Sequence, residues 1–202
     1  MSLLIIGIAR GISLEDLIPA FEASLQGGIR DLEITMNTPE AVNLIHEARQ
    51  HFEGRARIGA GTVCNRSDLD RALAAGAQFV VSPLTDPNLI RACVDQGISV
   101  FPGAFTPTEV YTAWQAGATQ VKVFPLGSVD GPSYLKELKG PFPQIPLLAC
   151  GGVTVENVKS YRQAGAAGLA IGSKLFNPRW LADKTYSLIT QAAQSFSAAS
   201  SG

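Results

Sequence analysis

A regular alternation of short apolar runs and segments with helical periodicity constrains the fold of this chain more than any other feature. The apolar runs recur about every 20 to 25 residues, and a polar or glycine-containing turn follows each one. Helices are expected to begin near Ser13, Thr38, Ser67, Thr106 and Thr154, because these residue types are typical N-caps. Strands are expected at residues 3–8, 31–35, 56–60, 78–81, 99–102, 120–124, 146–149 and 168–171.

Eight strand–helix units without an internal linker predict an α/β fold, a single-domain (β/α)8 TIM barrel with short loops. Residues 1–195 are expected to form this barrel, and residues 196–202 are expected to be a small polar C-terminal tail that is frayed. A doubly wound open sheet is the structural alternative. Residues 7–11, after the first strand, lack the Gly-x-Gly-x-x-Gly turn typical of dinucleotide-binding sheets of that kind, which counts against it.

Composition excludes several classes of function. The net charge of −1 gives no electrostatic reason to expect a nucleic acid or a membrane surface as a partner, so an anionic ligand must be held by a local site. No apolar run is long enough to cross a bilayer. The three cysteines are widely spaced and odd in number, which predicts neither a disulfide framework nor a metal cluster. A cytoplasmic protein is expected.

Lys122 lies at the centre of an apolar strand, where an ammonium group is costly to bury. One interpretation is an edge strand whose lysine points to solvent. In a barrel, Lys122 and Glu33 instead point inward from two different strands and become near neighbours. A structural salt bridge is the alternative for this pair, although such a bridge adds little to stability. Buried ion pairs are rare and tend to be functional, which favours a catalytic pair.

Two glycine-containing turns predict a phosphate site near the end of the chain. Gly151-Gly152 and Gly172-Ser173 each follow an apolar strand, in the loops where barrels commonly bind phosphate. Glycines let backbone N–H groups approach an anion, and helix N-termini favour its charge. The alternative is that these glycines only form tight turns.

Other residues at predicted strand ends are candidates to line a substrate site. The Thr62 hydroxyl is suited to bind a carboxylate, Pro83 and Phe124 shape walls, and Arg10 is an unpaired cation just past the first strand. An exposed structural arginine is the alternative for Arg10. Cys150 sits at the site, but it has no histidine partner and is not expected to be a nucleophile.

The two histidines do not predict a metal site. His46 and His51 are five residues apart, whereas a metal-binding pair on one helix is typically four apart, so both are expected on the surface.

The chain resembles the family of 2-dehydro-3-deoxy-phosphogluconate and 4-hydroxy-2-oxoglutarate (KDPG and KHG) aldolases. These are class I aldolases with a (β/α)8 barrel, and the resemblance extends from residue 5 to about residue 191. Five motifs in the right order and spacing carry it, at residues 28–35, 58–63, 101–103, 121–125 and 151–153.

The resemblance implies roles for the candidate residues. The Schiff-base lysine of the family corresponds to Lys122, its general acid/base glutamate to Glu33 and its pyruvate-binding threonine to Thr62. The phosphate-binding loops correspond to Gly151-Gly152 and Gly172-Ser173. The family also implies a homotrimer that needs no metal or organic cofactor. The implied reaction cleaves a phosphorylated 2-keto-3-deoxy sugar acid to pyruvate and glyceraldehyde 3-phosphate.

Two departures from the family pattern bear on the substrate. Asn37 stands where the gluconate-type enzymes commonly carry an arginine, and Cys150 stands where a threonine precedes the double glycine. The 2-dehydro-3-deoxy-6-phosphogalactonate branch resembles this chain more closely, because it has the asparagine and an Arg-Gly-Ile like residues 10–12. Two alternatives stay open at this point. One is a phosphosugar isomerase or synthase in which Lys122 is an electrostatic clamp, and the other is a non-catalytic phosphosugar-binding protein.

Overall fold

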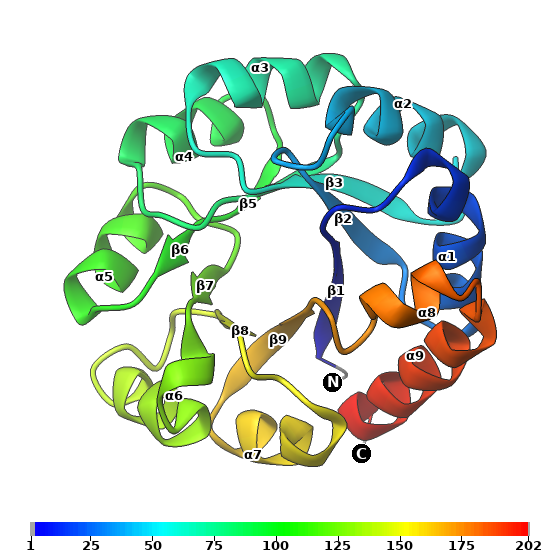
Figure 1. The fold of residues 1–202 in the computed structure, drawn as a ribbon. Coiled ribbons are helices and arrows are strands. Elements are labelled where there is room, and N and C mark those ends of the chain that lie inside the picture. Colours follow the sequence, from blue (N-terminus) through cyan, green and yellow to red (C-terminus); the bar gives the residue numbers. More distant parts are fainter. Residues whose placement is uncertain (1–2, 202) are drawn as a thin grey trace.

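The computed structural model describes residues 3–201 and consists of a ring of parallel strands surrounded by helices (Figure 1). The sheet has nine strands in the order β5-β4-β3-β2-β1-β9-β8-β7-β6. This nearly closed ring confirms the predicted (β/α)8 barrel and shows that the open-sheet alternative is wrong. The strands are β1 (Leu4–Ala9), β2 (Asp31–Thr35), β3 (Arg57–Gly61), β4 (Phe79–Val81), β5 (Ser99–Phe101), β6 (Gly103–Ala104), β7 (Val121–Val123), β8 (Leu147–Cys150) and β9 (Ala166–Ile171).

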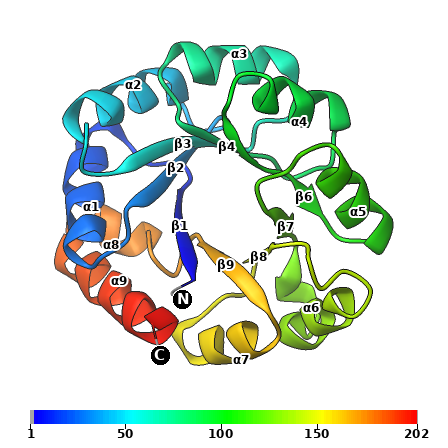
Figure 2. The ribbon, with the colours of Figure 1, turned by 180° about the vertical axis from the view of Figure 1, so that it is seen from behind.

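The helices lie outside the ring of strands, as the view from behind also shows (Figure 2). Two short 3-10 turns, η1 (Leu126–Ser128) and η2 (Val155–Asn157), follow β7 and β8. The α-helices are α1 (Leu14–Gln26), α2 (Ala41–His51), α3 (Arg66–Ala74), α4 (Pro87–Val94), α5 (Pro107–Gln115), α6 (Gly131–Lys139), α7 (Val158–Gln163), α8 (Pro178–Ala182) and α9 (Tyr186–Ser201). No helix within residues 3–201 combines the length and the apolar character needed to cross a bilayer.

The ninth strand, β6, lies just beyond the predicted fifth strand (residues 99–102), and Pro102 separates it from β5. Proline has no N–H group to donate to the ladder. The carbonyl groups still bridge both neighbours: Phe101 O accepts from Ser82 N at 3.2 Å, and Pro102 O accepts from Lys122 N at 2.9 Å. The segment of β5 and β6 therefore joins β4 to β7 and closes the ring.

Three of the predicted N-caps are found. The Ser13 hydroxyl accepts the Asp16 N–H at 3.1 Å at the start of α1. Thr106 forms a reciprocal capping box with Glu109 at the start of α5. Thr154 forms a similar box, but it caps η2, which leads into α7.

Two predicted N-caps are wrong. Helix α2 begins after Glu40, because the Thr38 hydroxyl is engaged with the Thr35 hydroxyl at 2.9 Å and with Gly11 N at 2.9 Å. Helix α3 is capped by Asn65 rather than by Ser67, since the Asn65 side chain accepts the Asp68 N–H at 2.9 Å.

The C-terminal segment is ordered where the sequence predicts fraying. Helix α9 continues to Ser201, and Gly202 lies outside the described residues. Phe196 is buried, and the Ser197 hydroxyl donates to Gly27 O at 2.8 Å. Gly27 permits this close packing of α9 on α1, because a Cβ atom there would lie 2.8 Å from Thr190 O. The fraying prediction is therefore wrong for residues 196–201.

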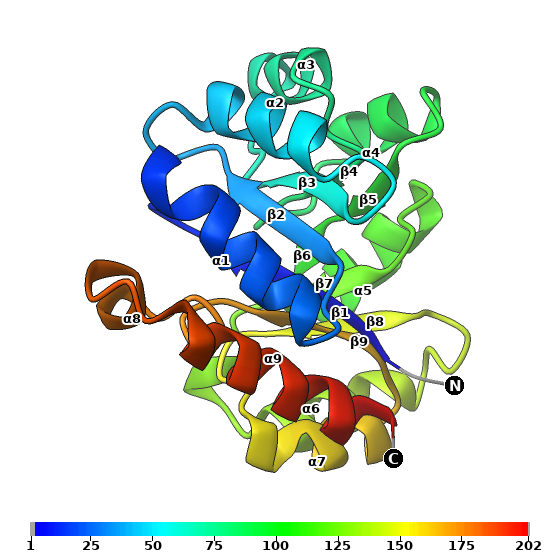
Figure 3. The ribbon, with the colours of Figure 1, turned by 90° about the vertical axis from the view of Figure 1, so that its right-hand side faces the viewer.

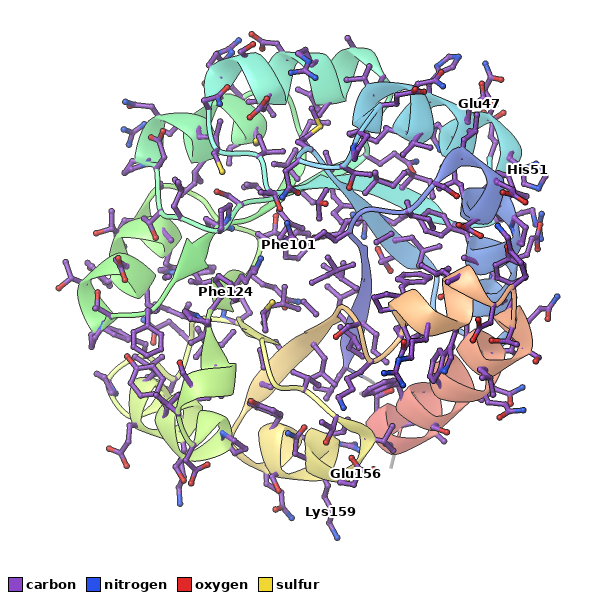
Figure 4. The ribbon with its side chains drawn as sticks, viewed as in Figure 1. Glu47, His51, Phe101, Phe124, Glu156 and Lys159 are labelled. Carbon is purple, nitrogen blue, oxygen red and sulfur yellow. The ribbon has the colours of Figure 1, made fainter. Side chains whose placement is uncertain are left out.

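The interior of the barrel is filled mainly by an apolar cluster, which leaves few positions for polar groups. Figure 4 shows Phe101 and Phe124 directed into the ring, whereas Glu47, His51, Glu156 and Lys159 lie on its periphery. The cluster consists of Ile6, Phe79, Val81, Phe101, Leu148, Cys150 and Ala170.

A buried carboxylate connects the first helix, α1, to the junction between α8 and α9. Asp16 on α1 accepts hydrogen bonds from Ser13 Oγ at 2.6 Å, from Lys184 Nζ at 2.7 Å and from Tyr186 Oη at 2.7 Å. Burial raises the pKa of Asp16, but the hydrogen bonds from Lys184, Ser13 and Tyr186 outweigh this effect and hold the pKa below its usual value. Figure 3 shows α8 at the end of the barrel opposite the two termini, so this network anchors α8 near the C-terminal ends of the strands.

We expect Asp16→Asn to lower the free energy of unfolding by about 2 kcal/mol at neutral pH, because it removes a charge-assisted network. Since the pKa of Asp16 is lower in the folded state, the difference from wild type is complete above about pH 4 and shrinks as the pH falls. Urea unfolding at pH 7 and pH 3 measures both values. Glu15→Gln is the matched control, because Glu15 is exposed and forms an ion pair with the same Lys184, at 3.1 Å. A loss for Asp16→Asn no larger than for Glu15→Gln would contradict the prediction.

Candidate active site

Lys122 points into the barrel. Its neighbours Val121 and Val123 pack in the layer between the sheet and the helices, and period-2 alternation turns Lys122 to the opposite face. The residue is 6% exposed, and β7 is paired on both sides, so the edge-strand interpretation is wrong. The ammonium nitrogen lies 4.9 Å from the ring centroid of Phe124, a favourable cation–π distance. The amine of Lys122 is thus held beside an aromatic wall.

Glu33 supplies an interior carboxyl group from β2. It is 1% exposed, and its Oε2 atom has no hydrogen-bond partner among residues 3–201. Burial raises the pKa of Glu33 to about 7, while the positive charges of Lys122 and Arg10 oppose that rise. A buried polar atom without a partner is uncommon and is typical of functional sites. Because Oε2 is unpaired, this oxygen is not used in a structural salt bridge.

A hydrogen-bonded chain spans the ends of three neighbouring strands. Arg10, after β1, donates from Nη1 to Asn37 Oδ1 at 2.8 Å and from Nη2 to Thr62 Oγ1 at 3.3 Å. Both acceptors are neutral, so the positive charge of Arg10 is not cancelled by them. Thr62 adopts a φ of 57°, which is rare for a β-branched residue and is a kind of strain that clusters at functional sites.

The double-glycine turn lies at the other side of the mouth of the barrel. Gly151 and Gly152 have φ values of 91° and 69°, which glycine adopts without strain. A Cβ atom on Gly152 would lie 2.9 Å from Gly127 Cα in η1, so the two turns pack backbone to backbone. The tight turns that the sequence analysis gave as the alternative are therefore present. The phosphate-binding role of these glycines stays a prediction.

One cavity of about 530 Å³ brings together seven of the predicted site residues. Lys122 does not line the cavity, but its ammonium nitrogen contacts the lining residue Phe124. Asn37 and Thr62 do not line it either, and both accept hydrogen bonds from the lining residue Arg10. The predicted residues in the lining are Arg10, Phe124, Cys150, Gly151, Gly152, Gly172 and Ser173.

Pro83 lies away from this cavity. It sits after β4, and its carbonyl group packs against Gly103 at the start of β6. The structure does not bring Pro83 to the lining of the cavity, although it does place Pro83 at a strand end, as predicted.

The sequence did not indicate several lining residues, of which Lys174 is the most informative. Lys174 directly follows Gly172-Ser173 and is exposed, and it contributes a cation at the glycine-containing side of the cavity. Its position after a predicted phosphate turn was the available signal. The apolar lining residues that were missed are Ile8, Val153, Ala170, Ile171, Phe176 and Pro178.

Cys150 and the histidines do not add reactive groups to this site. Cys150 is 4% exposed, and burial raises the pKa of its thiol, so the thiol stays protonated at neutral pH. His46 bonds to Gln50, and His51 bonds to Glu22 on the outer surface. Within residues 3–201, no group of three His, Cys, Asp or Glu side chains is placed to hold a metal ion.

Comparisons with known proteins agree on one group of enzymes. A family model described as KDPG and KHG aldolase matches residues 2–192. The 2-dehydro-3-deoxy-6-phosphogalactonate aldolase of Escherichia coli (strain K12) is 36% identical over 182 residues, which cover 90% of this chain and 88% of that protein. A solved structure described as native KDPGal has a TM-score of 0.91 at 34% identity, covering 98% of this chain and 95% of that chain. The KDPG aldolase of Legionella pneumophila, solved with pyruvate captured at low pH as a covalent carbinolamine, has a TM-score of 0.87 at 30% identity, covering 97% and 95%.

The raised pKa of Glu33 predicts how stability depends on pH. The pKa is about 7 in the folded state, above the usual glutamate value, so the protonated form stabilises the fold at low pH. This contribution is lost as the pH rises through about 7, and a Glu33→Gln variant does not lose it. We expect wild type to lose about 2–3 kcal/mol of unfolding free energy relative to Glu33→Gln between pH 5 and pH 8. Urea unfolding of both proteins at these two pH values measures the change, and a constant difference would contradict it.

Proposed function

The chain belongs to the KDPG and KHG aldolase family, and we infer that it is a class I aldolase that forms a Schiff base with its substrate. It cleaves a phosphorylated 2-keto-3-deoxy sugar acid to pyruvate and glyceraldehyde 3-phosphate. The observation that carries this inference is the presence inside the barrel of a buried lysine and a buried carboxyl group that interact electrostatically, with the Oε2 atom of the carboxyl group free of any hydrogen-bond partner among residues 3–201. Lys122 is 6% exposed, Glu33 is 1% exposed, and the pKa of Glu33 is about 7.

Lys122 is the proposed nucleophile. Its neutral amine attacks the C2 ketone of the substrate, and loss of water from the resulting carbinolamine gives an iminium ion. The positive nitrogen accepts the electron pair of the C3–C4 bond as this bond breaks, which releases glyceraldehyde 3-phosphate and leaves an enamine. Protonation of the enamine at C3 and hydrolysis of the iminium then release pyruvate and restore the amine. The captured carbinolamine of the Legionella pneumophila relative supports this route.

Glu33 is the proposed acid and base for these steps. As an acid it protonates the carbinolamine hydroxyl, which leaves as water. As a base it accepts the proton of the C4 hydroxyl during bond cleavage, and it then returns a proton to C3 of the enamine. A pKa of about 7 suits both directions of transfer near neutral pH. The partnerless Oε2 atom is available for the proton.

The two ends of the substrate have separate proposed binding groups. Arg10 and Thr62 bind the carboxylate, since both side chains that accept hydrogen bonds from Arg10 are neutral and leave its charge available. The turns Gly151-Gly152 and Gly172-Ser173 bind the phosphate, with Lys174 as an added cation at the same side of the cavity. Phe124 and Cys150 form the apolar wall between them, and Pro83 supports the strand end beyond it.

We propose the galactonate epimer, 2-dehydro-3-deoxy-6-phosphogalactonate, as the preferred substrate. Arg10 donates directly to Asn37, and these are the two positions at which the chain resembles that branch of the family. The relative in Escherichia coli and the native KDPGal structure support the same choice. The homotrimeric assembly belongs to this proposal on the family resemblance, and the cytoplasmic location belongs to it on the composition of the chain.

Reduction with sodium borohydride in the presence of pyruvate tests the class I mechanism. We expect a stable adduct on the tryptic peptide that contains Lys122, because borohydride reduces the iminium. Lys122→Met is expected to give no adduct and no cleavage. Lys174→Met is the matched control, since Lys174 is also at the cavity, and it should keep the adduct. Folded wild-type protein without an adduct on Lys122 would rule out the aldolase and favour the isomerase or binding-protein alternatives.

Steady-state kinetics with both epimers test the binding of the substrate. We expect wild type to have the higher kcat/KM for the galactonate epimer. Arg10→Ala should lower kcat/KM about 100-fold, because it removes a charge that contacts the substrate. Asn37→Ala should lower it about 10-fold, because it removes one hydrogen bond that orients Arg10. Arg66→Ala, on the exposed face of α3, is the control that should change nothing. Equal small effects of Arg10→Ala and Asn37→Ala would contradict the role of Arg10, and a preference for the gluconate epimer would contradict the choice of epimer.

A further inference from the structure

We propose that Gly61 is a positioning residue for Glu33, because its missing side chain leaves the space that the Glu33 carboxyl group occupies. The proposal rests on the acid and base role of Glu33 in the proposed function. Gly61 ends β3, next to β2, and its register partner on β2 is Thr35. Glu33 pairs in register with Gly59, so its side chain leans two residues along β3 toward the C-terminal end of the barrel.

The fit between Gly61 and Glu33 is close. A Cβ atom on Gly61 would overlap Glu33 Oε1 and would lie 2.7 Å from Cδ and 3.3 Å from Cγ. Contacts below about 3.4 Å are repulsive for carbon, so the carboxyl group would have to move. Glu33 is 1% exposed, and the overlap involves Cδ and Cγ as well as the terminal oxygen, so the whole carboxyl group has to shift within a close-packed interior.

The backbone does not explain the glycine. Gly61 lies in a strand and does not have the positive φ that Gly151 and Gly152 have. Glycine weakens a strand, and an interior strand position normally favours a β-branched or larger residue. Gly61 therefore costs stability at this position, and the space for the Glu33 carboxyl group is the physical gain.

Gly59 provides a comparison within the same strand. It faces the same side as Gly61, but a Cβ atom there would lie 2.5 Å from Phe79 Cδ2 and Cζ. Phe79 belongs to the apolar cluster inside the barrel. The two glycines thus accommodate two different side chains: one receives an aromatic ring, and the other receives the catalytic carboxyl group.

The position of the carboxyl group matters because two positive charges from other parts of the barrel act on it. Lys122 on β7 and Arg10 after β1 favour its ionised form. A shift of about 1 Å in a proton-transferring group can reduce a rate about 100-fold.

The first test is the Gly61→Ala variant assayed with the galactonate epimer. We expect kcat to fall about 10- to 100-fold, because the methyl group displaces the carboxyl group from the reacting atoms. KM should stay within about threefold of wild type, because the variant leaves Arg10 and the glycine turns in place. A fall in kcat of less than about twofold would overturn the proposal.

The second test is a double-mutant cycle with Glu33→Ala, which empties the space beside Gly61. Adding Gly61→Ala to Glu33→Ala should leave the residual kcat unchanged within about twofold and raise Tm by about 2–5 °C, because the methyl group partly fills the cavity. In the wild-type background, Gly61→Ala should lower Tm by about 3–10 °C or prevent folding. Gly59→Ala is the matched control and should lower Tm in both backgrounds, because Phe79 is present in each.

The cycle separates this proposal from the proposed function. Equal losses of Tm from Gly61→Ala in both backgrounds would show that the glycine serves the backbone, and would overturn the proposal. If wild type gives no pyruvate adduct on Lys122, the aldolase function fails, whereas the stability cycle still reports whether Gly61 and Glu33 share one space. A wild-type adduct together with an additive cycle would sink the positioning role alone.

Discussion

The cost of moving charged groups out of water governs the rest of this structure. An apolar cluster fills most of the barrel interior, and Lys122 and Glu33 project into what remains. In that environment a carboxylate is stable only beside compensating positive charge. Burial raises the pKa of Glu33 to about 7, and Lys122 and Arg10 keep it from rising further. Desolvation of Glu33 thus costs folding free energy, but it also lets the carboxyl group donate and accept protons at neutral pH.

Close backbone packing shapes part of the mouth of the barrel, whereas side chains fill its interior. Gly151 and Gly152 pack against η1 so closely that a side chain would collide, and Thr62 is held at an unfavourable φ beside Arg10. These strained and crowded segments lower the stability of the fold, and the packing of the core below them offsets that cost. Under the proposed function, this division assigns the binding of charged substrate groups to the rim and the covalent chemistry to the interior.

The barrel and its interior pair follow from the sequence because both depend on local periodicity. Alternation in the strands placed Lys122 and Glu33 inside, and eight strand–helix units predicted the ring. Contacts between distant segments were not visible in this way. The bond from Arg10 to Asn37, the seating of α9 on Gly27 and the place of Lys174 at the cavity depend on how loops meet in space. Gly61 was missed for a related reason, since an empty side-chain position has no signature of its own.

The pairing of the first strand with the last has a consequence for synthesis on the ribosome. Strand β1 lies between β2 and β9, so one of its edges has no partner until residues 166–171 have been made. The bond between Asp16 and Lys184 spans 168 residues and forms later still. An apolar strand with an unpaired edge is prone to pair with other chains while it waits. The nascent chain therefore carries its greatest risk of aggregation until β9 emerges, because the pairing of β9 with β1 ends this exposure.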